Sequence, residues 1–475
     1  VYKRQQQDLQ EDLSGKVQKL PSDILKYYDL ASGLMIDGVG SDYIKWNMAS
    51  FMGRVNYGYM GRYLLTLSAR YDGSSRLAEG HKWVLFPSAA LAWRISDEPF
   101  MKDLVWLDNL KLRVGYGKTG NSAVSPYQTK GQLALRHYVF NNGSSEYIGY
   151  APSVMANDQL TWETTDQWNV GVDFGFLKNR INGTVEFYLQ NTKDLLLKRQ
   201  LPVVSGFSSV MSNVGSTRNK GIEITLNTRN IMNRNFTWST DLTFSANKEE
   251  IVELYNGKTD DVGNLWFIGQ PIDVYYNYKK IGIWQNTEND LAEMAKFNEK
   301  GANFKPGSIR LEDVDGDYKI TEEDKQILGS VRPKFVASMV NNFEFKGFDL
   351  SVFLYASVGG LLRNNIEFME KPGRGNTVKV DYWTSTNPTN AFPRPSVDVE
   401  KLDYISTLGY DKADFLRIRN ITLGYTLPEM WSKKVLMDKI RIYLSANNPA
   451  IFTNFTGIDP EGCLLYTSPS PRDRS

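Results

Sequence analysis

The residues with the clearest capacity for chemistry lie in one acidic segment, residues 313–324. Carboxylates stand at its positions 1, 3, 5 and 12, as Asp313, Asp315, Asp317 and Asp324, and Lys319 supplies a backbone carbonyl at position 7. Oxygen atoms in this order can surround a Ca²⁺ ion, because this cation prefers a shell of hard oxygen ligands. The spacing therefore predicts a structural calcium site.

Two departures from the usual calcium loop leave a second interpretation open. Tyr318 occupies the position where glycine normally allows a sharp turn, and Asp324 is shorter than the glutamate that normally closes such a loop. Gly316, close by, relieves part of the turn. The segment is therefore either a structural Ca²⁺ site or a metal-free acidic turn. Neither interpretation makes it catalytic, and no cofactor is required.

Other reactive side chains are too few for an enzyme active site. The chain has two histidines, His81 and His137, and one cysteine, Cys463. Neither histidine is near a serine motif, which argues against a catalytic triad. Adjacent carboxylates such as Glu249 and Glu250 seldom face each other across a substrate, so we interpret them as solvated loop charges. We expect that the protein is not an enzyme.

Four aromatic residues in long polar segments are candidates for contact with a substrate or a lid protein: Trp266, Tyr382, Trp383 and Phe392. Aromatic rings in loops can stack on sugar rings or pack beneath another protein. The same rings can instead pack within the loops themselves. Both interpretations stay open at this point.

Composition excludes several classes of protein. The 475 residues carry 55 Lys and Arg against 54 Asp and Glu, so the net charge of +1 gives no basic excess for nucleic acid. Mean hydropathy is −0.40, and no apolar run approaches the roughly 18 residues that a membrane-spanning helix needs. Aromatic residues reach 13% of the chain, which is high for a soluble enzyme. A membrane β-barrel fits these values, because its apolar residues alternate with polar ones.

The elements that must position these residues have a two-residue periodicity. In residues 63–71, for example, every second residue is apolar or aromatic. Such runs approach the roughly 9–11 residues with which a tilted strand crosses a membrane, and aromatic residues at their ends suit interfacial girdles. The pattern predicts an all-β fold, an incomplete antiparallel transmembrane β-barrel with about twelve wall strands. We expect them near 50–59, 63–71, 83–95, 110–118, 166–176, 181–191, 217–229, 236–247, 335–346, 348–357, 415–427 and 440–447.

The connections between these strands alternate in length. Short turns are expected at 60–62, 95–109, 177–180, 230–235 and 346–347, and long polar segments at about 117–165, 191–216, 249–333 and 358–414. Outer-membrane barrels have short periplasmic turns and long extracellular loops. The alternation holds only if the strand-like residues 274–278 lie inside a loop and not in the barrel wall.

Short motifs follow one another along the chain in a specific order. They are RYDGSSR at 70–76, FPS at 86–88, LKLR at 110–113, GYGKTGN at 115–121, WET at 162–164, NVG at 213–215, NKGIE at 219–223, PKF at 333–335, LGY at 423–425, NN at 447–448 and GIDPE at 457–461. In order and spacing they resemble the SusC/RagA family, the large TonB-dependent outer-membrane transporters of Bacteroidetes.

The resemblance implies a barrel of about 22 strands around a plug, of which this chain supplies a part. It implies import of a nutrient, most often an oligosaccharide and in some branches a peptide, beneath a SusD-like surface lipoprotein that acts as a lid. Energy would come from the TonB–ExbB–ExbD complex through an N-terminal region that lies outside this chain. A siderophore or metal-chelate receptor, and a non-transport surface adhesin or binding protein, remain the alternatives.

The two ends of the chain read as translated sequencing adaptor. We therefore expect residues 1–5 and 463–475 to be non-native scars, and residues 6–462 to be the barrel fragment. Cys463 then lies in a scar. We further expect early strands and one closing strand to lie outside this chain. The strands near Ser50 and Ile440 would then be unpaired edges, which would make the isolated fragment prone to aggregation.

Overall fold

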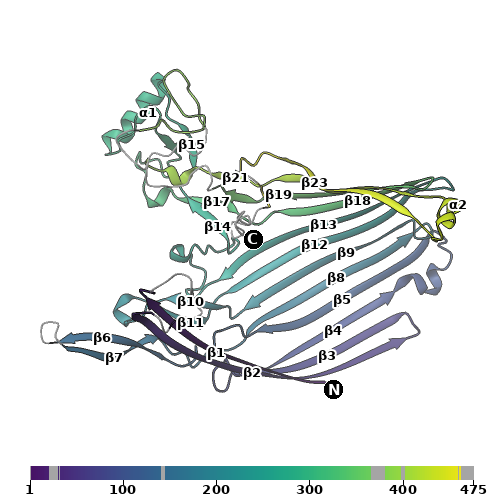
Figure 1. The fold of residues 1–475 in the computed structure, drawn as a ribbon, viewed down its shortest axis with the longest axis horizontal. Coiled ribbons are helices and arrows are strands. Elements are labelled where there is room, and N and C mark those ends of the chain that lie inside the picture. The colour runs from purple at the N-terminus through teal and green to yellow at the C-terminus, as the bar shows by residue number, and fades with distance from the viewer. Residues whose placement is uncertain are drawn as a thin grey trace.

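The computed structural model describes residues 2–20, 30, 33–140, 145–364, 380–396, 402–457 and 459–461. Its main feature is one antiparallel sheet of thirteen strands, ordered β1-β2-β3-β4-β5-β8-β9-β12-β13-β18-β19-β22-β23 (Figure 1). Each strand pairs with the next wall strand along the chain, as in an up-and-down barrel. Among the described residues β1 and β23 are not paired with each other, so the sheet is open. The wall strands are β1 (Tyr2–Gln18), β2 (Met35–Tyr59), β3 (Tyr63–Ser74), β4 (Trp83–Arg94), β5 (Leu107–Asn121), β8 (Glu163–Phe176), β9 (Ile181–Lys193), β12 (Ser216–Met232), β13 (Phe236–Glu253), β18 (Phe335–Phe345), β19 (Phe348–Val358), β22 (Phe415–Thr426) and β23 (Arg441–Thr453).

All twelve strands expected from the sequence are present, together with one that the sequence did not predict. The strand β1 pairs with β2 along its length, with Arg4 opposite Ser50. The prediction that the strand near Ser50 is an edge is therefore wrong, whereas β23 does lie at the far end of the sheet. The strand β1 was not predicted because its residues are mostly polar and show no apolar alternation, and because residues 2–5 read as adaptor. The second expected scar lies outside the described residues.

Short and long connections gather at opposite ends of the sheet (Figure 1). Two of the short turns use a pair of residues with positive φ, Met60 with Gly61 and Lys346 with Gly347. Paired positive φ values match the right-handed twist of flanking strands, which is why such turns close hairpins. We call the two ends the turn end and the loop end.

The long loops carry secondary structure of their own. The strand-like segment near 274–278 is present as β14, and it pairs with β17 outside the wall, as the alternation required. The loop elements are β6 (Gln132–Phe140), β7 (Ser145–Val154), β10 (Leu196–Gln200), β11 (Ser209–Asn213), β14 (Val274–Asn277), β15 (Lys280–Ile283), α1 (Glu288–Glu299), β16 (Ile309–Leu311), β17 (Gln326–Ser330), β20 (Leu361–Arg363) and β21 (Tyr410–Lys412), with 3₁₀ turns at Val203–Ser205, Val262–Asn264, Glu322–Asp324 and Ile405–Thr407.

Among the residues that the structure describes from 33 onward, helix is confined to loops and turns. At the turn end lie α2 (Glu429–Ser432) and 3₁₀ turns at Ile95–Asp97, Pro99–Met101 and Lys433–Val435. Within the part of the chain that the structure describes, no helix combines the length and apolar character needed to cross a membrane.

The strand register separates the sheet into an apolar and a polar face, since directly opposed residues in a ladder share one face. One row runs Leu91, Val114, Val170, Phe187 and Ile222 across five strands. By the same register, the apolar face holds all six residues expected there: Leu65, Leu67, Val170, Val172, Leu350 and Val352. The polar face holds Arg70, Asp173 and Glu223.

Aromatic residues form two lines on the apolar face. The turn-end girdle includes the ring pairs Tyr63–Trp93, Trp238–Phe343 and Phe348–Tyr425. The loop-end girdle includes Tyr71–Trp83, Tyr116–Trp168 and Phe244–Phe335. Between the girdles, large apolar side chains such as Leu67 and Phe187 are 45% and 55% exposed. An apolar surface of this extent needs an apolar environment, and two aromatic lines bordering it are typical of a membrane-spanning wall.

Candidate functional site

Two long loops combine into one folded unit above the loop end of the sheet. This outer-loop domain comprises the described residues of 254–333 and 380–413 (Figure 1). Its core is aromatic: Trp284 is 1% exposed and packs edge-on against Phe297, with ring centroids 5.9 Å apart. Phe297 comes from α1, which starts at the Thr287 cap and buries Met294 and Phe297 on one face. The domain therefore has a conventional hydrophobic core of its own.

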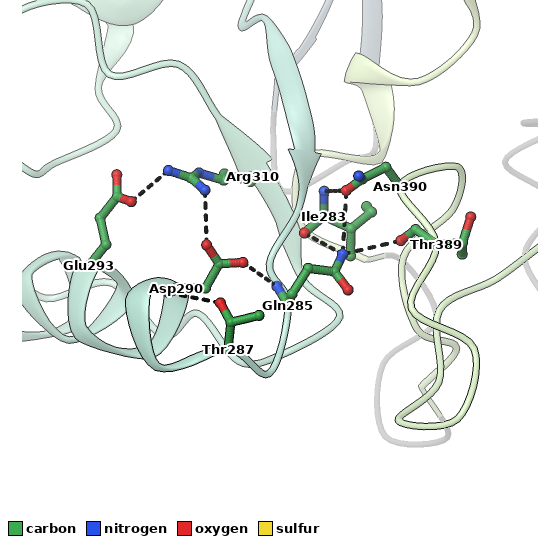
Figure 2. Close-up of polar contacts among 8 residues, drawn as sticks. All are labelled: Ile283, Gln285, Thr287, Asp290, Glu293, Arg310, Thr389 and Asn390. Atoms are coloured by element: carbon green, nitrogen blue, oxygen red, sulfur yellow. Dashed lines mark hydrogen bonds and ion pairs between the residues drawn. The ribbon is translucent and has the colours of Figure 1, made fainter.

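Polar contacts at the base of α1 tie the first loop together (Figure 2). Arg310 lies between two carboxylates of α1, with distances of 3.1 Å to Asp290 and 2.6 Å to Glu293. Its guanidinium also lies 4.4 Å from the ring centre of Trp284. The second oxygen of Asp290 accepts a hydrogen bond of 2.8 Å from the Gln285 backbone N–H. The strand β16 is thereby fixed against α1.

The same network joins the second loop to the first (Figure 2). The Asn390 side-chain oxygen accepts a 3.0 Å hydrogen bond from the Ile283 backbone N–H. The Gln285 amide donates to the backbone carbonyls of Ile283 and Thr389, at 2.7 and 3.3 Å. Residues more than 100 positions apart in sequence are therefore held in one arrangement.

The structure brings three of the four candidate aromatics together. Trp383 is 7% exposed in the core of the outer-loop domain, and its indole N–H donates to the Gln285 side chain at 2.8 Å. Tyr382 is 46% exposed, and its backbone forms an isolated β-bridge with Phe392. The Phe392 side chain packs at the edge of that core. Trp266 lies half-buried in a separate turn, where its backbone pairs with Asp261. Trp383 thus has a packing role, and Tyr382 is the most accessible of the set.

A cavity of about 510 Å³ opens beside Phe392, a volume in the range of small-ligand sites. Its lining combines apolar, aromatic and charged side chains, including Lys279, Lys280, Gln326, Phe392, Tyr410 and Asp411. The Lys280 ammonium donates to the backbone carbonyls of Asn390 and Ala391, both at 2.7 Å, and burial lowers the pKa of Lys280. The sequence carried no signal for this cavity, because its walls come from distant segments.

The acidic loop lies on the surface of the same domain. One carboxylate oxygen from each of Asp313, Asp315 and Asp317 falls within 4.8 Å of the others. Tyr318 adopts a φ of 62°, so it takes the left-handed conformation that glycine usually supplies. The Asp317 N–H lowers the pKa of Asp315, but burial and the charges of Asp317 and Asp324 outweigh it, and the pKa of Asp315 is raised. Three of the predicted ligands are therefore grouped.

The remaining two predicted ligands make contacts within the loop. Asp324 is 1% exposed, and its two oxygens accept hydrogen bonds from the backbone N–H groups of Val314 (2.8 Å) and Thr321 (2.7 Å). The Lys319 N–H donates to Asp317 at 2.7 Å. Asp324 thus closes the loop by capping its backbone.

Charged pairs on the polar face of the sheet are not evident from the sequence. Arg113 contacts Asp173 at 2.9 Å and Glu186 at 3.2 Å, across β5, β8 and β9. On β22, Arg417 pairs with Asp459 at 2.5 Å. The motifs around these residues are visible in the sequence, but strand register is needed to show which charges meet. Paired charges on this face suit a water-filled interior.

A sheet with one girdled apolar face, one charged face, and turns and loops sorted to opposite ends is the wall of an outer-membrane β-barrel. The sequence matches the family described as "TonB dependent receptor-like, beta-barrel" over residues 17–448, and the chain belongs to this family. Family members are outer-membrane proteins and not enzymes, which agrees with the expectations from the sequence.

Named relatives place the chain in the SusC/RagA type. It is 34% identical over 454 residues to "TonB-dependent receptor P3" of Formosa agariphila, covering 92% of this chain and 44% of the relative. It is 33% identical to "TonB-dependent receptor SusC" of Bacteroides thetaiotaomicron, covering 87% of this chain and 41% of that protein. The chain therefore spans less than half the length of these relatives.

The fold also matches a solved structure. The "RagAB peptide transporter" superposes with a TM-score of 0.75 and 26% sequence identity, covering 92% of this chain and 48% of the matched chain. The resemblance to the SusC/RagA family and the all-β barrel fold are thereby confirmed.

Proposed function

We propose that the protein to which this chain belongs imports a nutrient across the outer membrane, with an oligosaccharide as the first candidate and a peptide as the second. The observation that carries the proposal is the sheet itself, with a girdled apolar face outside and a charged face inside. A charged interior lets a polar solute pass, while the apolar face holds the wall in lipid. The named relatives SusC and RagAB support the same activity.

Two partners belong to this proposal. A SusD-like surface lipoprotein would cover the loop end, and the TonB–ExbB–ExbD complex would supply energy through a region outside this chain. The outer-loop domain supports the proposal of a lipoprotein partner, because it has its own hydrophobic core and presents Tyr382 on its surface. The related RagAB complex is a peptide transporter, so peptides stand beside oligosaccharides as the substrate class.

A second proposal concerns the acidic loop, which we assign as a structural Ca²⁺ site. Asp313, Asp315 and Asp317 would each give one oxygen and Lys319 its backbone carbonyl, with Asp324 holding the loop closed. The raised pKa of Asp315 supports the assignment, because crowded carboxylates favour either a proton or a cation.

Transport is tested by deleting the gene and comparing growth on single oligosaccharides and on peptides as sole nutrients. The proposal expects loss of growth on one of these classes, and recovery with the wild-type gene. A strain lacking TonB should show the same defect. Unchanged growth on both classes, together with lost attachment to a surface, would favour an adhesin instead. A defect restricted to iron-limited medium would favour a siderophore receptor.

A further inference from the structure

A cluster of cations lies on the apolar face of the wall, directly at the loop-end girdle. We call Lys193, Arg218, Lys220 and Lys248 the outer-face basic cluster. The register sets Leu189 of β9 opposite Lys220 of β12, and Lys220 opposite Lys248 of β13. Along β9, Lys193 follows Leu189 on the same face, and it lies opposite Ser216. Four cations on three neighbouring strands therefore share the membrane-facing surface.

The position of this cluster along the strands is sharply defined. The row that contains Lys220 also contains Leu189, Trp168 and Tyr116, and the last two belong to the loop-end girdle. Below this row, the same face of β9, β12 and β13 holds no charge as far as the turn end; its members there include Val185, Phe187, Ile222, Ile224, Leu226, Leu242, Phe244 and Ala246. Charge begins where the apolar band ends, at the level of lipid headgroups.

Two cations of the cluster, Lys193 and Arg218, border a depression in the surface. This depression is a cavity of about 510 Å³, and its lining includes Tyr116, Asp166, Trp168, Asn191, Lys193 and Arg218. Aromatic rings thus form the membrane side of the cavity and cations its outer side. Tyr and Trp rings at this depth pack against the first part of an acyl chain, whereas Lys and Arg reach outward to headgroups.

The acidic residues nearby do not neutralise the cluster. Glu250 is shared between Arg218, at 3.6 Å, and Lys248, at 3.5 Å. Asp166 accepts a 2.9 Å hydrogen bond from the Tyr116 hydroxyl. Among the described residues, Lys193 and Lys220 have no carboxylate within 4.0 Å. The cluster therefore keeps an excess of positive charge, and two of its amines are available to a ligand.

We propose that this surface binds the phosphorylated headgroup of a lipid in the outer leaflet of the outer membrane. Phosphate oxygens would accept charge-assisted hydrogen bonds from Lys193, Arg218 and Lys220, and an acyl chain would lie against the girdle beneath them. Charge complementarity favours a phosphate, and continuity with the apolar face favours a lipid over a soluble anion. The site goes beyond the proposed import, because it faces the membrane and not the interior.

The test uses the intact transporter, purified in detergent and exposed to lipid A, to dephosphorylated lipid A, or to inorganic phosphate. Native mass spectrometry measures the bound lipid. Wild-type protein should retain lipid A at least about five-fold better than the dephosphorylated form, because charge-assisted hydrogen bonds are lost with the phosphate. The triple variant Lys193→Gln, Arg218→Gln, Lys220→Gln should lose this preference. Replacing Lys193 and Lys220 by arginine should preserve it.

A matched control replaces three exposed lysines of the outer-loop domain, Lys258, Lys300 and Lys305, by glutamine, and should bind as wild type. Equal retention of lipid A by the triple variant, or equal binding of the dephosphorylated lipid by wild type, would overturn the proposal. Displacement of lipid A by millimolar inorganic phosphate would overturn it too, because it would reveal a soluble-anion site. If the triple variant has a lowered Tm, the single variant Arg218→Gln replaces it in the test. We expect this single variant to retain about two-fold less lipid A than wild type.

Discussion

The wall of the sheet and the outer-loop domain shield their apolar side chains from water in opposite ways. In the domain, Trp284, Phe297 and Phe304 pack against one another and are nearly inaccessible. In the wall, Leu67 and Phe187 stay about half exposed, and no second layer of the protein is needed if lipid surrounds them. The solvent, as well as the sequence, therefore decides which residues form a core. Each region should therefore respond to a different kind of substitution.

The largest effect should come from the core of the outer-loop domain. Truncating a buried aromatic ring typically costs about 3–5 kcal/mol, so Trp284→Ala should unfold this domain locally. Hydrogen exchange of the intact transporter should show faster exchange in α1 and β16, with the wall strands unchanged. Tyr382→Ala, at an exposed ring of the same domain, is the control and should leave exchange as in wild type. Loss of protection in the wall as well would contradict the separation of the two regions.

The wall should respond most to charge on its apolar face. An arginine near the bilayer midplane costs about 2–4 kcal/mol in membrane barrels, so Val172→Arg should lower the free energy of unfolding in lipid by that amount. Thr225→Arg places the same side chain on the polar face and should change little. Urea unfolding in lipid vesicles compares the two. Equal destabilisation by both substitutions would argue against a lipid-facing apolar face.

Calcium should sharpen the difference between the regions, since its proposed site lies in the outer-loop domain alone. Replacing both Asp313 and Asp317 by asparagine should weaken Ca²⁺ binding at least about ten-fold in calorimetry, because affinity follows the ligand charge count. Replacing Glu288 and Glu299, exposed on α1, should not weaken it. Because the pKa of Asp315 is raised, its proton competes with the cation as the pH falls, so binding should be stronger at neutral pH than in acid. If wild-type protein releases or absorbs no heat of binding at millimolar Ca²⁺, the assignment of a calcium site is wrong.

The smallest effect concerns a carboxylate at the turn end of the wall. Glu98 accepts hydrogen bonds from the Tyr63 hydroxyl (2.6 Å) and the Trp93 indole (2.9 Å), and with Arg62 these hold its pKa below the ordinary value. A lowered folded-state pKa stabilises the fold above the unfolded pKa, and this contribution is lost as the pH falls through the folded value. Glu98→Gln should lower the Tm of the wall more at about pH 7 than at about pH 3. An equal loss at both values would show that charge is not the cause.

Sequence periodicity was sufficient to predict the strands of the wall, but it could not predict the structure of the loops. Twelve strands were predicted because alternation in runs such as residues 63–71 reflects the two faces directly. The strand β1 was missed because it carries no such alternation, and its pairing with β2 depends on tertiary context. In the outer-loop domain, the acidic spacing located Asp313, Asp315 and Asp317 together, since those residues are close in sequence. The burial of Trp383 against Gln285 joins segments 98 positions apart, which no local pattern encodes.

The central claim, that the apolar face meets lipid and the polar face meets water, is tested most directly at two adjacent residues of β12. Glu223 and Ile224 lie on opposite faces at almost the same depth. In the intact transporter, freed of any other cysteine, Glu223→Cys and Ile224→Cys would each carry a fluorophore in vesicles containing a lipid-borne quencher. We expect strong quenching at position 224 and little at position 223. Equal quenching at both positions, or stronger quenching at position 223, would contradict this account.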